Sequence, residues 1–504
     1  MNLSVLNPVF NIIDFGAEPD GVTLCTQAFA SAIEACGNAG GGTIFVPGGE
    51  FLTGAIHLES NMTLFVDAGA RVKFSQDPAD FPVIDSRWEG LNRRTHSPQI
   101  YAYGQQNIAV AGQGIIDGQG GIWWELYRNQ KLEYPRPRLI SFERCNNISI
   151  SGITLMNSPS WTVNPIRCEN VTVHQATIIN PPDSPNTDGI NPDSCRNVHI
   201  SNCHIDVGDD CIAIKSGREG CLPEVPCENI TITNCTMVHG HGGVVIGSEM
   251  SGGVRNVVIS NCVFEGTDRG IRIKTRRGRG GIVEDVRADN IIMKGVLCPF
   301  ALYMYYFCGP GGKDPVVADK NPRPFNKGTP VFRRFYFSNI TATEVNAAAG
   351  FIYGLPESPV TDLSFDHVVV KMAQDAVPGY PAMMGGLQPM RRAGFFCCNA
   401  QRISWNQFQT QGPEGPAFII NQAGQIEFNG CSATEMAPAE PVIRLEQVKG
   451  AFIHGCRSNP EQKTFLELKG PETRGVELTG NSGAIRREQI VIAPEVPPES
   501  IVIR

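Results

Sequence analysis

The stretch CRNVHISNC, residues 195–203, sets the pattern that decides the fold of this chain. Val198 and Ile200 alternate with polar residues, which is typical of a short strand with one buried face. Asn197 precedes the strand, and a cysteine stands at each end of the stretch. Because the arrangement recurs along the chain, it indicates a repeated structural unit rather than one isolated strand.

The repeat is marked by an asparagine followed by alternating apolar residues and a polar turn. Its asparagines are Asn107, Asn147, Asn170, Asn197, Asn229 and Asn256. From the second to the last, they are 23, 27, 32 and 27 residues apart. Two columns of cysteines accompany them: Cys145, Cys168, Cys195 and Cys227 before the asparagines, and Cys203, Cys235 and Cys262 after them.

Short-strand repeats of this length predict an all-β solenoid, a parallel β-helix with one repeat per coil. Strands of successive coils lie about 4.8 Å apart, so equivalent positions stack. We therefore expect the cysteines to form ladders inside the coils or at their turns. We expect the asparagines to hydrogen-bond the turn backbone of the next coil. No CxxC pair occurs, so the cysteines do not predict a metal site.

Four polar clusters lie within this repeat. They read NTDG at 186–189, GDD at 208–210, GHG at 240–242 and RIK at 272–274. Each stands at or just before a short strand-like run. These runs, taken from residues 188, 210, 243 and 269, are 22, 33 and 26 residues apart. Stacked coils would then gather three carboxylates, an imidazole and two cations in one cleft.

The three carboxylates of Asp188, Asp209 and Asp210 are the chemical centre of this prediction. Like-charge repulsion and partial burial raise the pKa of at least one of them, which keeps a proton donor near neutral pH. The others stay ionised and can activate water, as hydrolysis of a glycosidic bond requires. Taken alone, each motif reads as a turn or a surface pair. Their conjunction at solenoid spacing carries the interpretation.

A local basic run follows in an otherwise acidic chain. Arg272 and Lys274 point to the same side of their strand because side chains alternate. Beside the carboxylates, they predict a ligand with both a scissile bond and anionic groups, a polyuronate. Arg276, Arg277 and Arg279 follow in a glycine-rich stretch. Two alternatives stay open for these three arginines: wider substrate subsites or exposed surface.

Composition excludes several classes of protein. The 504 residues carry a net charge of −8, which argues against general nucleic-acid binding. No run of 18 apolar residues occurs, so we expect no membrane span. No Lys or Arg precedes Arg71, and the 17 cysteines are odd in number, which favours free thiols in a reducing compartment. We therefore expect a cytoplasmic protein, or a secreted one if an export signal has been trimmed. The sequence does not predict an oligomeric state.

The chain is expected to contain two parts. Residues 1–395 are predicted as the catalytic β-helix with an N-terminal cap, and residues 396–504 as further β-coils or a small β domain. The cap includes a helix at residues 26–36, for which Thr26 can serve as the N-cap. Residues 300–326 and 374–394 are predicted as long loops.

The four clusters resemble the signature of glycoside hydrolase family 28, the polygalacturonases and their relatives. The resemblance covers roughly residues 10–370, includes DFGA at 14–17, and shows all four motifs in order. It implies a right-handed, single-stranded parallel β-helix of the pectin lyase-like type. It also implies hydrolysis of α-1,4-galacturonosyl bonds with inversion, on pectic substrates and without a cofactor or metal.

The resemblance also implies a role for each residue of the clusters. Asp209 would be the general acid, and Asp188 and Asp210 would be the pair that activates water. His241 would lie beside the acid and keep its proton in place. Arg272 and Lys274 would bind a galacturonate carboxylate, and Asn186 and Tyr303 would be further substrate contacts.

The loops bear on where a polymer would be cut. Extra sequence at 73–106 and 300–330 is expected to wall off one end of the groove, as in exo-acting bacterial relatives. We therefore predict release of galacturonic acid from chain ends of oligogalacturonides. An endo-polygalacturonase and a rhamnogalacturonan hydrolase are alternatives within the family. A calcium-dependent pectate lyase and a non-catalytic carbohydrate-binding solenoid are alternatives outside it.

Overall fold

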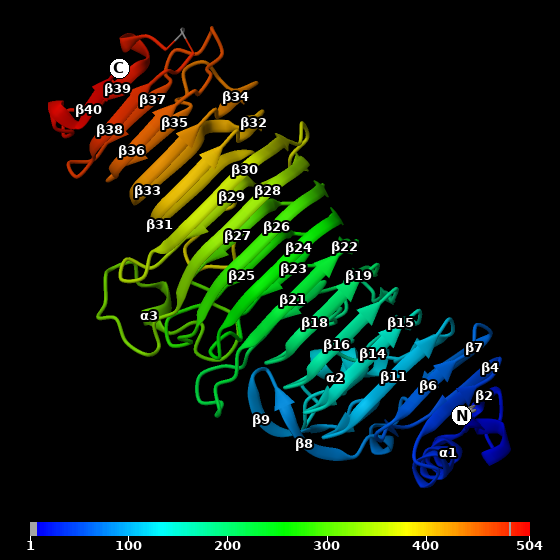
Figure 1. Ribbon diagram of the computed structural model, residues 1–504. Helices are drawn as coiled ribbons and strands as arrows, with labels where there is room; N and C mark the ends of the chain where they lie inside the picture. Colours follow the sequence, from blue (N-terminus) through cyan, green and yellow to red (C-terminus); the bar gives the residue numbers. More distant parts are fainter. Residues whose placement is uncertain (1–7, 483–484) are drawn as a thin grey trace, which may run out of the picture. The chain divides into compact units, whose positions relative to one another are not determined.

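The computed structural model describes residues 8–482 and 485–504, which Figure 1 draws as ribbons. Parallel strands wound into coils make up most of these residues. The chain is a right-handed, single-stranded parallel β-helix, so the predicted fold class is confirmed. It divides into two compact units, one ending at His241 and the other beginning at Gly242. The helices are α1 (Thr26–Asn38), α2 (Gly121–Arg128) and α3 (Pro315–Ala318), and the 3-10 turns are Ile12–Phe15, Pro78–Asp80, Arg487–Gln489 and Pro498–Ser500.

The first unit winds its strands into coils with three parallel faces. Its strands are β1 (Val9–Asn11), β2 (Asp20–Leu24), β3 (Gly42–Val46), β4 (Gly49–Thr53), β5 (Ile56–His57), β6 (Met62–Val66), β7 (Ala70–Phe74), β8 (Val83–Trp88), β9 (Leu91–His96), β10 (Ile100–Tyr103), β11 (Gln106–Gly112), β12 (Ile115–Asp117), β13 (Ile140–Glu143), β14 (Asn146–Ser151), β15 (Thr154–Met156), β16 (Glu169–His174), β17 (Thr177–Ile179), β18 (Arg196–Ser201), β19 (His204–Val207), β20 (Ile212–Ile214), β21 (Cys227–Thr233) and β22 (Thr236–His239).

Each face of the first unit is a ladder of parallel strands. One runs β6–β11–β14–β16–β18–β21, and a second runs β7–β12–β15–β17–β19–β22. The third begins as β5–β10–β13 and continues as single bridges that join Ile140, Val163, Ile190 and Ile212. The predicted acidic residues lie on this third face.

The second unit uses longer strands, several of which bend through two faces. Its strands are β23 (Val244–Ile246), β24 (Val254–Glu265), β25 (Arg269–Lys274), β26 (Ile282–Lys294), β27 (Cys298–Tyr303), β28 (Val331–Val345), β29 (Ala348–Tyr353), β30 (Val360–Met372), β31 (Ala393–Asn406), β32 (Gln409–Gln411), β33 (Glu414–Asn429), β34 (Ser432–Thr434), β35 (Ile443–Glu446), β36 (Lys449–His454), β37 (Leu466–Lys469), β38 (Arg474–Thr479), β39 (Ile490–Ile492) and β40 (Ile501–Ile503). Strand β31 runs through residue 395, and parallel pairing continues as far as β40. The division of the chain at residue 395 stays a prediction.

Asparagine side chains join successive coils of the first unit. Nδ2 of Asn147 donates to Oδ1 of Asn107 at 2.7 Å, and Asn229 donates in the same way to Asn197 at 3.1 Å. These residues have φ values of 57° or 58°, a left-handed conformation that asparagine tolerates well. The prediction that they bond the turn backbone was wrong. The repeated conformation places one amide directly over the next, so the side chains bond each other.

The first cysteine column forms the predicted buried ladder. The backbone N–H groups of Cys145, Cys168 and Cys195 each donate to the sulfur of the cysteine on the following coil, at 3.3–3.4 Å. All of these thiols are free and buried. A thiol is small enough to fit the coil interior, and its sulfur accepts a hydrogen bond from the turn above.

Two local predictions need correction. Helix α1 forms where expected, but Thr26 does not cap it, because its hydroxyl accepts the N–H of Gly54 at 2.7 Å. Residues 300–303 are not part of a loop. They belong to the fully buried strand β27, since their apolar side chains fill the core and the glycines and prolines begin only at Gly309. The loop itself runs from 304 to 330 and contains α3. The second predicted loop lies between β30 and β31.

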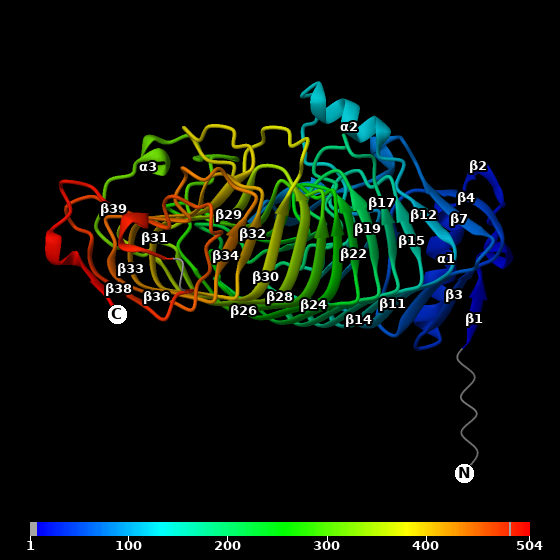
Figure 2. The same ribbon diagram turned by 90° about the horizontal axis from the view of Figure 1, so that it is seen from above.

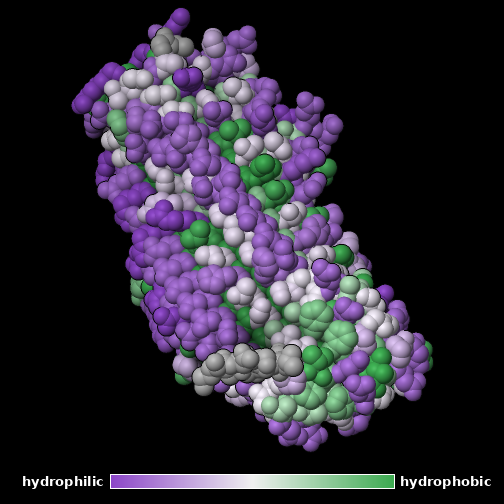
Figure 3. Space-filling view, turned by 45° about the vertical axis from the view of Figure 1, so that its right-hand side comes forward, coloured by the Kyte–Doolittle hydropathy of each residue, from purple (hydrophilic) through white to green (hydrophobic). Residues whose placement is uncertain are grey.

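Other features stand outside the coils. Segment 73–106 contains an antiparallel hairpin, β8–β9, whose tip pairs Trp88 with Leu91. Figure 2 shows helix α2 projecting from the coils of the first unit. The face seen in Figure 3 is largely hydrophilic, with apolar residues in small groups. Among the residues described here, none of the helices is both long enough and apolar enough to cross a membrane.

Candidate active site

The sequence-predicted acidic residues of the first unit come together. Ile190 bridges Ile212 in parallel register, and Asp188 and Asp210 each lie two residues before these positions. The N–H of Gly189 donates to the carbonyl of Asp210 at 3.1 Å, which fixes the two coils at this point. The 22-residue step seen in the sequence is therefore one coil, and the two aspartates are direct neighbours.

The three carboxylates form a compact cluster. One oxygen from each of Asp188, Asp209 and Asp210 lies within 4.8 Å of the others. Asp188 and Asp210 are buried, with 3% and 1% of their surface exposed, whereas Asp209 is half-buried. The Asp209 carboxylate accepts the N–H of Asp210 at 2.8 Å, so its position is held by its own turn. The half-buried member is the one that a substrate can reach most directly.

Gly240 and His241 stand over Asp209. The backbone N–H of His241 donates to the carbonyl of Asp209 at 3.2 Å. Gly240 has a φ of +74°, and a Cβ placed on it would lie 2.3 Å from the same carbonyl oxygen. Only glycine allows this close approach. The Gly-His-Gly motif therefore fixes the backbone of the exposed His241 against the backbone of the half-buried Asp209.

Asp188 lies in an environment that disfavours its ionised form. Burial and the neighbouring charge of Asp209 raise the pKa of Asp188 to about 7. Lys215 opposes this shift, because its Nζ lies 3.6 Å from Oδ2 of Asp188. Asn191 donates to the same oxygen at 2.9 Å. A carboxylate so placed exchanges its proton near neutral pH, the range in which acid–base catalysis is efficient.

Asn186 is held by a buried arginine. Nη2 of Arg136 donates to Oδ1 of Asn186 at 2.8 Å, and Nη1 donates to the carbonyls of Pro159 and Pro185 at 2.9 and 2.7 Å. The guanidinium also lies 4.0 Å from the ring centre of Tyr127 on helix α2. Burial lowers the pKa of Arg136 to about 10, so the arginine keeps its charge at neutral pH. Arg136 fixes the amide that the sequence predicted as a sugar contact.

In the second unit, Arg272, Lys274 and Tyr303 lie together. The hydroxyl of Tyr303 accepts from Nε and Nη2 of Arg272 at 3.3 and 3.1 Å. Nζ of Lys274 lies 5.2 Å from the ring centre of Tyr306. Tyr303 is completely buried, like Arg272, and its predicted contact with substrate stays a prediction. In the structure its hydroxyl orients the Arg272 guanidinium.

A loop of the second unit covers Arg272. Nη2 of Arg272 contacts the sulfur of Met383 at 2.8 Å, and Arg272 is completely buried. Arg269, three residues earlier on β25, donates to the carbonyls of Tyr380 and Pro381 at 2.5 and 3.2 Å. The segment between β30 and β31 is thereby fixed over the predicted carboxylate clamp.

Arg276 and Arg277 anchor the other long loop. Arg276 donates to the carbonyls of Cys308 and Pro310, and Arg277 forms a buried ion pair with Glu357 at 2.6 Å. Arg277 also donates to the carbonyls of residues 316, 319 and 321. Arg276 and Arg277 are buried and bonded to the loop backbone, so they are not exposed surface, and their role in wider subsites stays a prediction. Arg279 is also buried, so it is not exposed surface.

Sequence reasoning missed Lys215, Asn191, Arg136 and the tryptophan pair of the first unit. Trp88 of the hairpin stacks on Trp161 at 4.9 Å, and Nζ of Lys215 lies 4.9 Å from the Trp161 ring centre. A signal did exist for Lys215. It is a lysine at the end of the apolar run Cys211-Ile212-Ala213-Ile214, where a buried charge needs a partner.

The carboxylate cluster also has the composition of a possible metal-binding site. Three carboxylates at this spacing can hold either a divalent cation or a shared proton. The Lys215 ammonium already supplies a positive charge to Asp188. This contact favours the proton, and it agrees with the prediction of acid–base chemistry.

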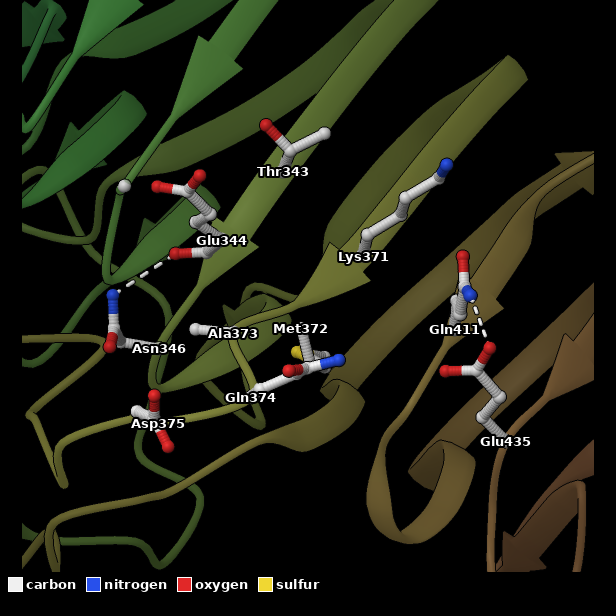
Figure 4. Close-up of a pocket in the computed structure, with 11 residues that line it drawn as sticks. Thr343, Glu344, Asn346, Lys371, Met372, Ala373, Gln374, Asp375, Gln411 and Glu435 are labelled. Carbon is white, nitrogen blue, oxygen red and sulfur yellow. Dashed lines mark hydrogen bonds between the residues drawn. The ribbon is translucent and has the colours of Figure 1, made fainter.

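A polar hollow in the second unit lies apart from the predicted residues. It measures about 620 Å³, stands at the ends of β28 and β30, and is lined by Glu344, Lys371 and Asp375 among others. Figure 4 shows Gln411 bonded to Glu435 on one wall and Asn346 bonded to Glu344 on another. None of the residues predicted for catalysis or substrate binding lines it.

Fold and site together define a class of protein: a parallel β-helix with an acid–base carboxylate cluster of the kind that cleaves glycosidic bonds. Comparison with known proteins narrows this class. The sequence profile described as Glycosyl hydrolases family 28 matches residues 36–374. The chain therefore belongs to glycosyl hydrolases family 28.

Individual relatives agree with this assignment. A protein of Vitis vinifera named "Probable polygalacturonase" is 36% identical over 378 residues, 73% of this chain and 75% of that protein. The "Endo-polygalacturonase" of Pectobacterium carotovorum subsp. carotovorum is 32% identical over 317 residues, 58% of this chain and 75% of that one. The solved structure of a hyperthermoactive exopolygalacturonase from Thermotoga maritima matches with a TM-score of 0.64 at 33% identity, over 73% of this chain and 88% of that chain.

Proposed function

We propose that this protein hydrolyses the α-1,4-galacturonosyl bonds of polygalacturonate and oligogalacturonides. The observation that carries the proposal is the cluster of Asp188, Asp209 and Asp210 within 4.8 Å, in a chain of this family. Its relatives named as polygalacturonases support the choice of substrate. The buried guanidinium of Arg272 and the ammonium of Lys274 supply the positive charge that galacturonate carboxylates need.

The proposed mechanism is a single displacement. Asp209 gives its proton to the glycosidic oxygen, and the bond from that oxygen to the anomeric carbon breaks. A water molecule attacks the same carbon from the opposite side and gives its proton to the pair Asp188 and Asp210. His241 stands beside Asp209 and keeps its proton in place. Asn186 contacts the sugar.

Inversion of the anomeric centre is part of the proposal. Inverting enzymes usually separate their carboxyl groups by about 6.5–9.5 Å, whereas these oxygens lie within 4.8 Å. The proposal of inversion therefore rests on the family. NMR of the first-formed sugar tests it: the β-anomer is expected, and an α-anomer as first product would show that the configuration is retained.

We also propose that the enzyme acts from a chain end. The β8–β9 hairpin packs on the coil next to Asp188, where Trp88 stacks on Trp161 and Arg87 pairs with Asp193 at 3.3 Å. The backbone of Thr162 donates to Asp188, which places Trp161 directly beside the catalytic coil. In this proposal the hairpin closes one end of the groove to a long polymer. The similarity to the exopolygalacturonase of Thermotoga maritima, at 33% identity, also supports exo action.

The time course of products tests both parts of this proposal. With polygalacturonate, galacturonic acid should be the first product, and long oligomers should be scarce at early times. Early long oligomers would overturn exo action and favour the endo alternative, which the Pectobacterium relative represents. An unsaturated product that absorbs ultraviolet light and requires calcium would favour a lyase. Cleavage of a rhamnose-containing pectin alone would favour a rhamnogalacturonan hydrolase.

A cytoplasmic location completes the proposal. All 17 cysteines are free, and every one except Cys308 is buried. Neighbouring thiols such as Cys145 and Cys168 stay reduced where the compartment is reducing. Oligogalacturonides that have entered the cell would then be the substrate. Fractionation of the producing cells tests this point: activity recovered only outside the cell would contradict it.

A further inference from the structure

We propose that the first unit carries a second uronate-binding site, formed between the β8–β9 hairpin and strands β10 and β13. The site rests on the proposed function for the identity of its ligand. It consists of two adjoining hollows of about 340 and 280 Å³. They share the wall residues Asp85, Ser86, Tyr103 and Glu143, and none of the catalytic residues lines either hollow. We call the two hollows the hairpin cleft.

The first hollow offers an aromatic surface. The ring of Tyr101 stacks on His57 of the preceding coil, with ring centres 4.3 Å apart and planes 3° from parallel. On its other side Tyr101 pairs in register with Ser141, a small residue that leaves the second ring face uncovered by a large side chain. Tyr103 points to the same side of β10 and is 53% exposed. These faces suit the apolar side of a pyranose ring.

The second hollow gathers three guanidinium groups from separate parts of the chain. Arg93 comes from β9, Arg144 follows β13, and Arg167 lies one coil later, because Glu143 bridges Ile166. Nε of Arg144 lies 4.0 Å from Glu143, and half of the Arg144 side chain stays exposed. Nη2 of Arg167 contacts the sulfur of Cys221 at 3.7 Å.

Two carboxylates also line the cleft, so the balance of charge decides what it can bind. Glu143 accepts a hydrogen bond from the hydroxyl of Ser86 at 3.1 Å and lies 4.0 Å from Nε of Arg144. The negative charge of Glu143 is therefore partly neutralised within the wall of the cleft. Asp85 is the second carboxylate. Three arginines against two acids leave the hairpin cleft positive in a protein of net charge −8. An anion is therefore attracted here against the charge of the whole chain.

The two hollows together specify a ligand with an apolar ring face and an anionic group. A galacturonate residue has both, since its ring can stack on tyrosine and its carboxylate can pair with arginine. Galactose lacks the carboxylate and would leave the arginines unsatisfied. The ligand is either free galacturonate, the product of the enzyme, or a galacturonate unit of an oligomer.

Direct binding measurements test the site without turnover. In an Asp209→Asn background, calorimetry with trigalacturonate should show two sites per chain, and adding Arg144→Ala with Tyr103→Ala should leave one. The affinity of the lost site should fall at least tenfold. Arg196→Ala is the matched control, because Arg196 is 60% exposed in the same unit and pairs with Glu228 away from the cleft. It should leave two sites.

Each other outcome is equally decisive. One site in the Asp209→Asn parent, or two sites retained in the triple variant, would overturn the proposal. Titration with galacturonic acid separates the two sources of ligand: binding of the monomer identifies the product, and binding of the trimer alone identifies an oligomer unit. Equal binding of galactose would overturn the role of the arginines. The proposed function fails separately, if the wild-type enzyme does not hydrolyse polygalacturonate.

Discussion

Lys215 places its ammonium nitrogen 3.6 Å from Oδ2 of Asp188, and only 5% of the lysine is exposed. The two residues lie on neighbouring coils of the first unit. Burial and Asp209 push the pKa of Asp188 up, and Lys215 draws it down. The resulting pKa of about 7 is a balance between burial and the neighbouring carboxylates, which raise it, and Lys215, which lowers it.

Replacing Lys215 should move the pH profile of the enzyme. In the proposed mechanism Asp188 must be ionised to accept a proton from water, so kcat/KM is expected to fall below pH 7 in the wild type. In Lys215→Met the pKa of Asp188 rises further, so the acidic limb should move up by about one pH unit. At pH 6 this corresponds to about a tenfold loss of kcat/KM. The measurement is kcat/KM on trigalacturonate from pH 5 to 9.

Lys215→Arg is the conservative control for this experiment. It keeps a cation near Asp188 and should restore most of the wild-type profile. A uniform loss at every pH in Lys215→Met, with the limb unmoved, would show that Lys215 serves packing against Trp161 and not the charge of Asp188.

The same pKa shift makes a prediction about stability. Folded Asp188 binds a proton up to about pH 7, whereas the unfolded carboxyl loses it near pH 4. The wild-type free energy of unfolding therefore decreases as the pH rises between these values. Asp188→Asn cannot ionise, so its melting temperature should exceed that of the wild type at pH 8. The difference in the free energy of unfolding between the variant and the wild type should shrink by roughly 3 kcal/mol on going from pH 8 to pH 5. A gap that is independent of pH would contradict the raised pKa.

Asp209→Asn tests the general acid directly. Without its proton the leaving group departs as an alkoxide, and kcat should fall by about a hundredfold or more while substrate binding persists. Asp206→Asn is a suitable control, since Asp206 is a partly exposed aspartate on the preceding strand β19 and pairs with His239 at 2.8 Å. It should keep full activity. A wild type that binds oligogalacturonides without turnover would instead support a non-catalytic solenoid.

Repetition explains how much of this molecule could be predicted from its sequence. The spacing of Asn170 and Asn197 reports the length of a coil, and equal offsets before Ile190 and Ile212 place Asp188 beside Asp210. Because the coils stack, residues one coil length apart in the sequence are neighbours in space. The fold and the carboxylate cluster can therefore be predicted from the repeat pattern.

Contacts that cross between faces or loops have no such period. Lys215 and Asp188 are 27 residues apart, whereas one coil at this point contains 22 residues. The two side chains therefore meet across the width of the third face, at a spacing that the repeat does not predict. Trp88 reaches Trp161 from an inserted hairpin, and Arg277 reaches Glu357 from 80 residues away. The cations at 276 and 277 look exposed in a glycine-rich run, and only the loop that folds back on them shows why they are buried.

Tyr303→Phe should separate substrate binding from catalysis. The hydroxyl of Tyr303 accepts two hydrogen bonds from the buried guanidinium of Arg272, so its removal leaves a charged donor less well oriented. KM for trigalacturonate should rise about tenfold, while kcat changes less. The preference for free over methyl-esterified substrate should weaken as well, because Arg272 is proposed to bind the galacturonate carboxylate. Tyr336→Phe, on β28, is the control and should leave both constants unchanged. An equal fall in kcat with KM unaltered would contradict this positioning role.

The ion pair between Arg277 and Glu357 should determine whether the 304–330 loop stays folded. Both side chains are only 6% exposed, and Nε to Oε1 is 2.6 Å. Glu357→Ala leaves a buried guanidinium without its counter-charge, which is expected to cost about 3–5 kcal/mol and to release the loop. Limited proteolysis should then cut within 304–330, and the melting temperature should fall. Asp362→Ala breaks the exposed pair with Arg402 in the same unit and should do neither, since exposed pairs contribute about 1 kcal/mol or less. The double variant Arg277→Met with Glu357→Leu should recover part of the stability, because it removes both charges. A Glu357→Ala protein as stable and protease-resistant as Asp362→Ala would show that the backbone contacts of Arg277 suffice to hold the loop.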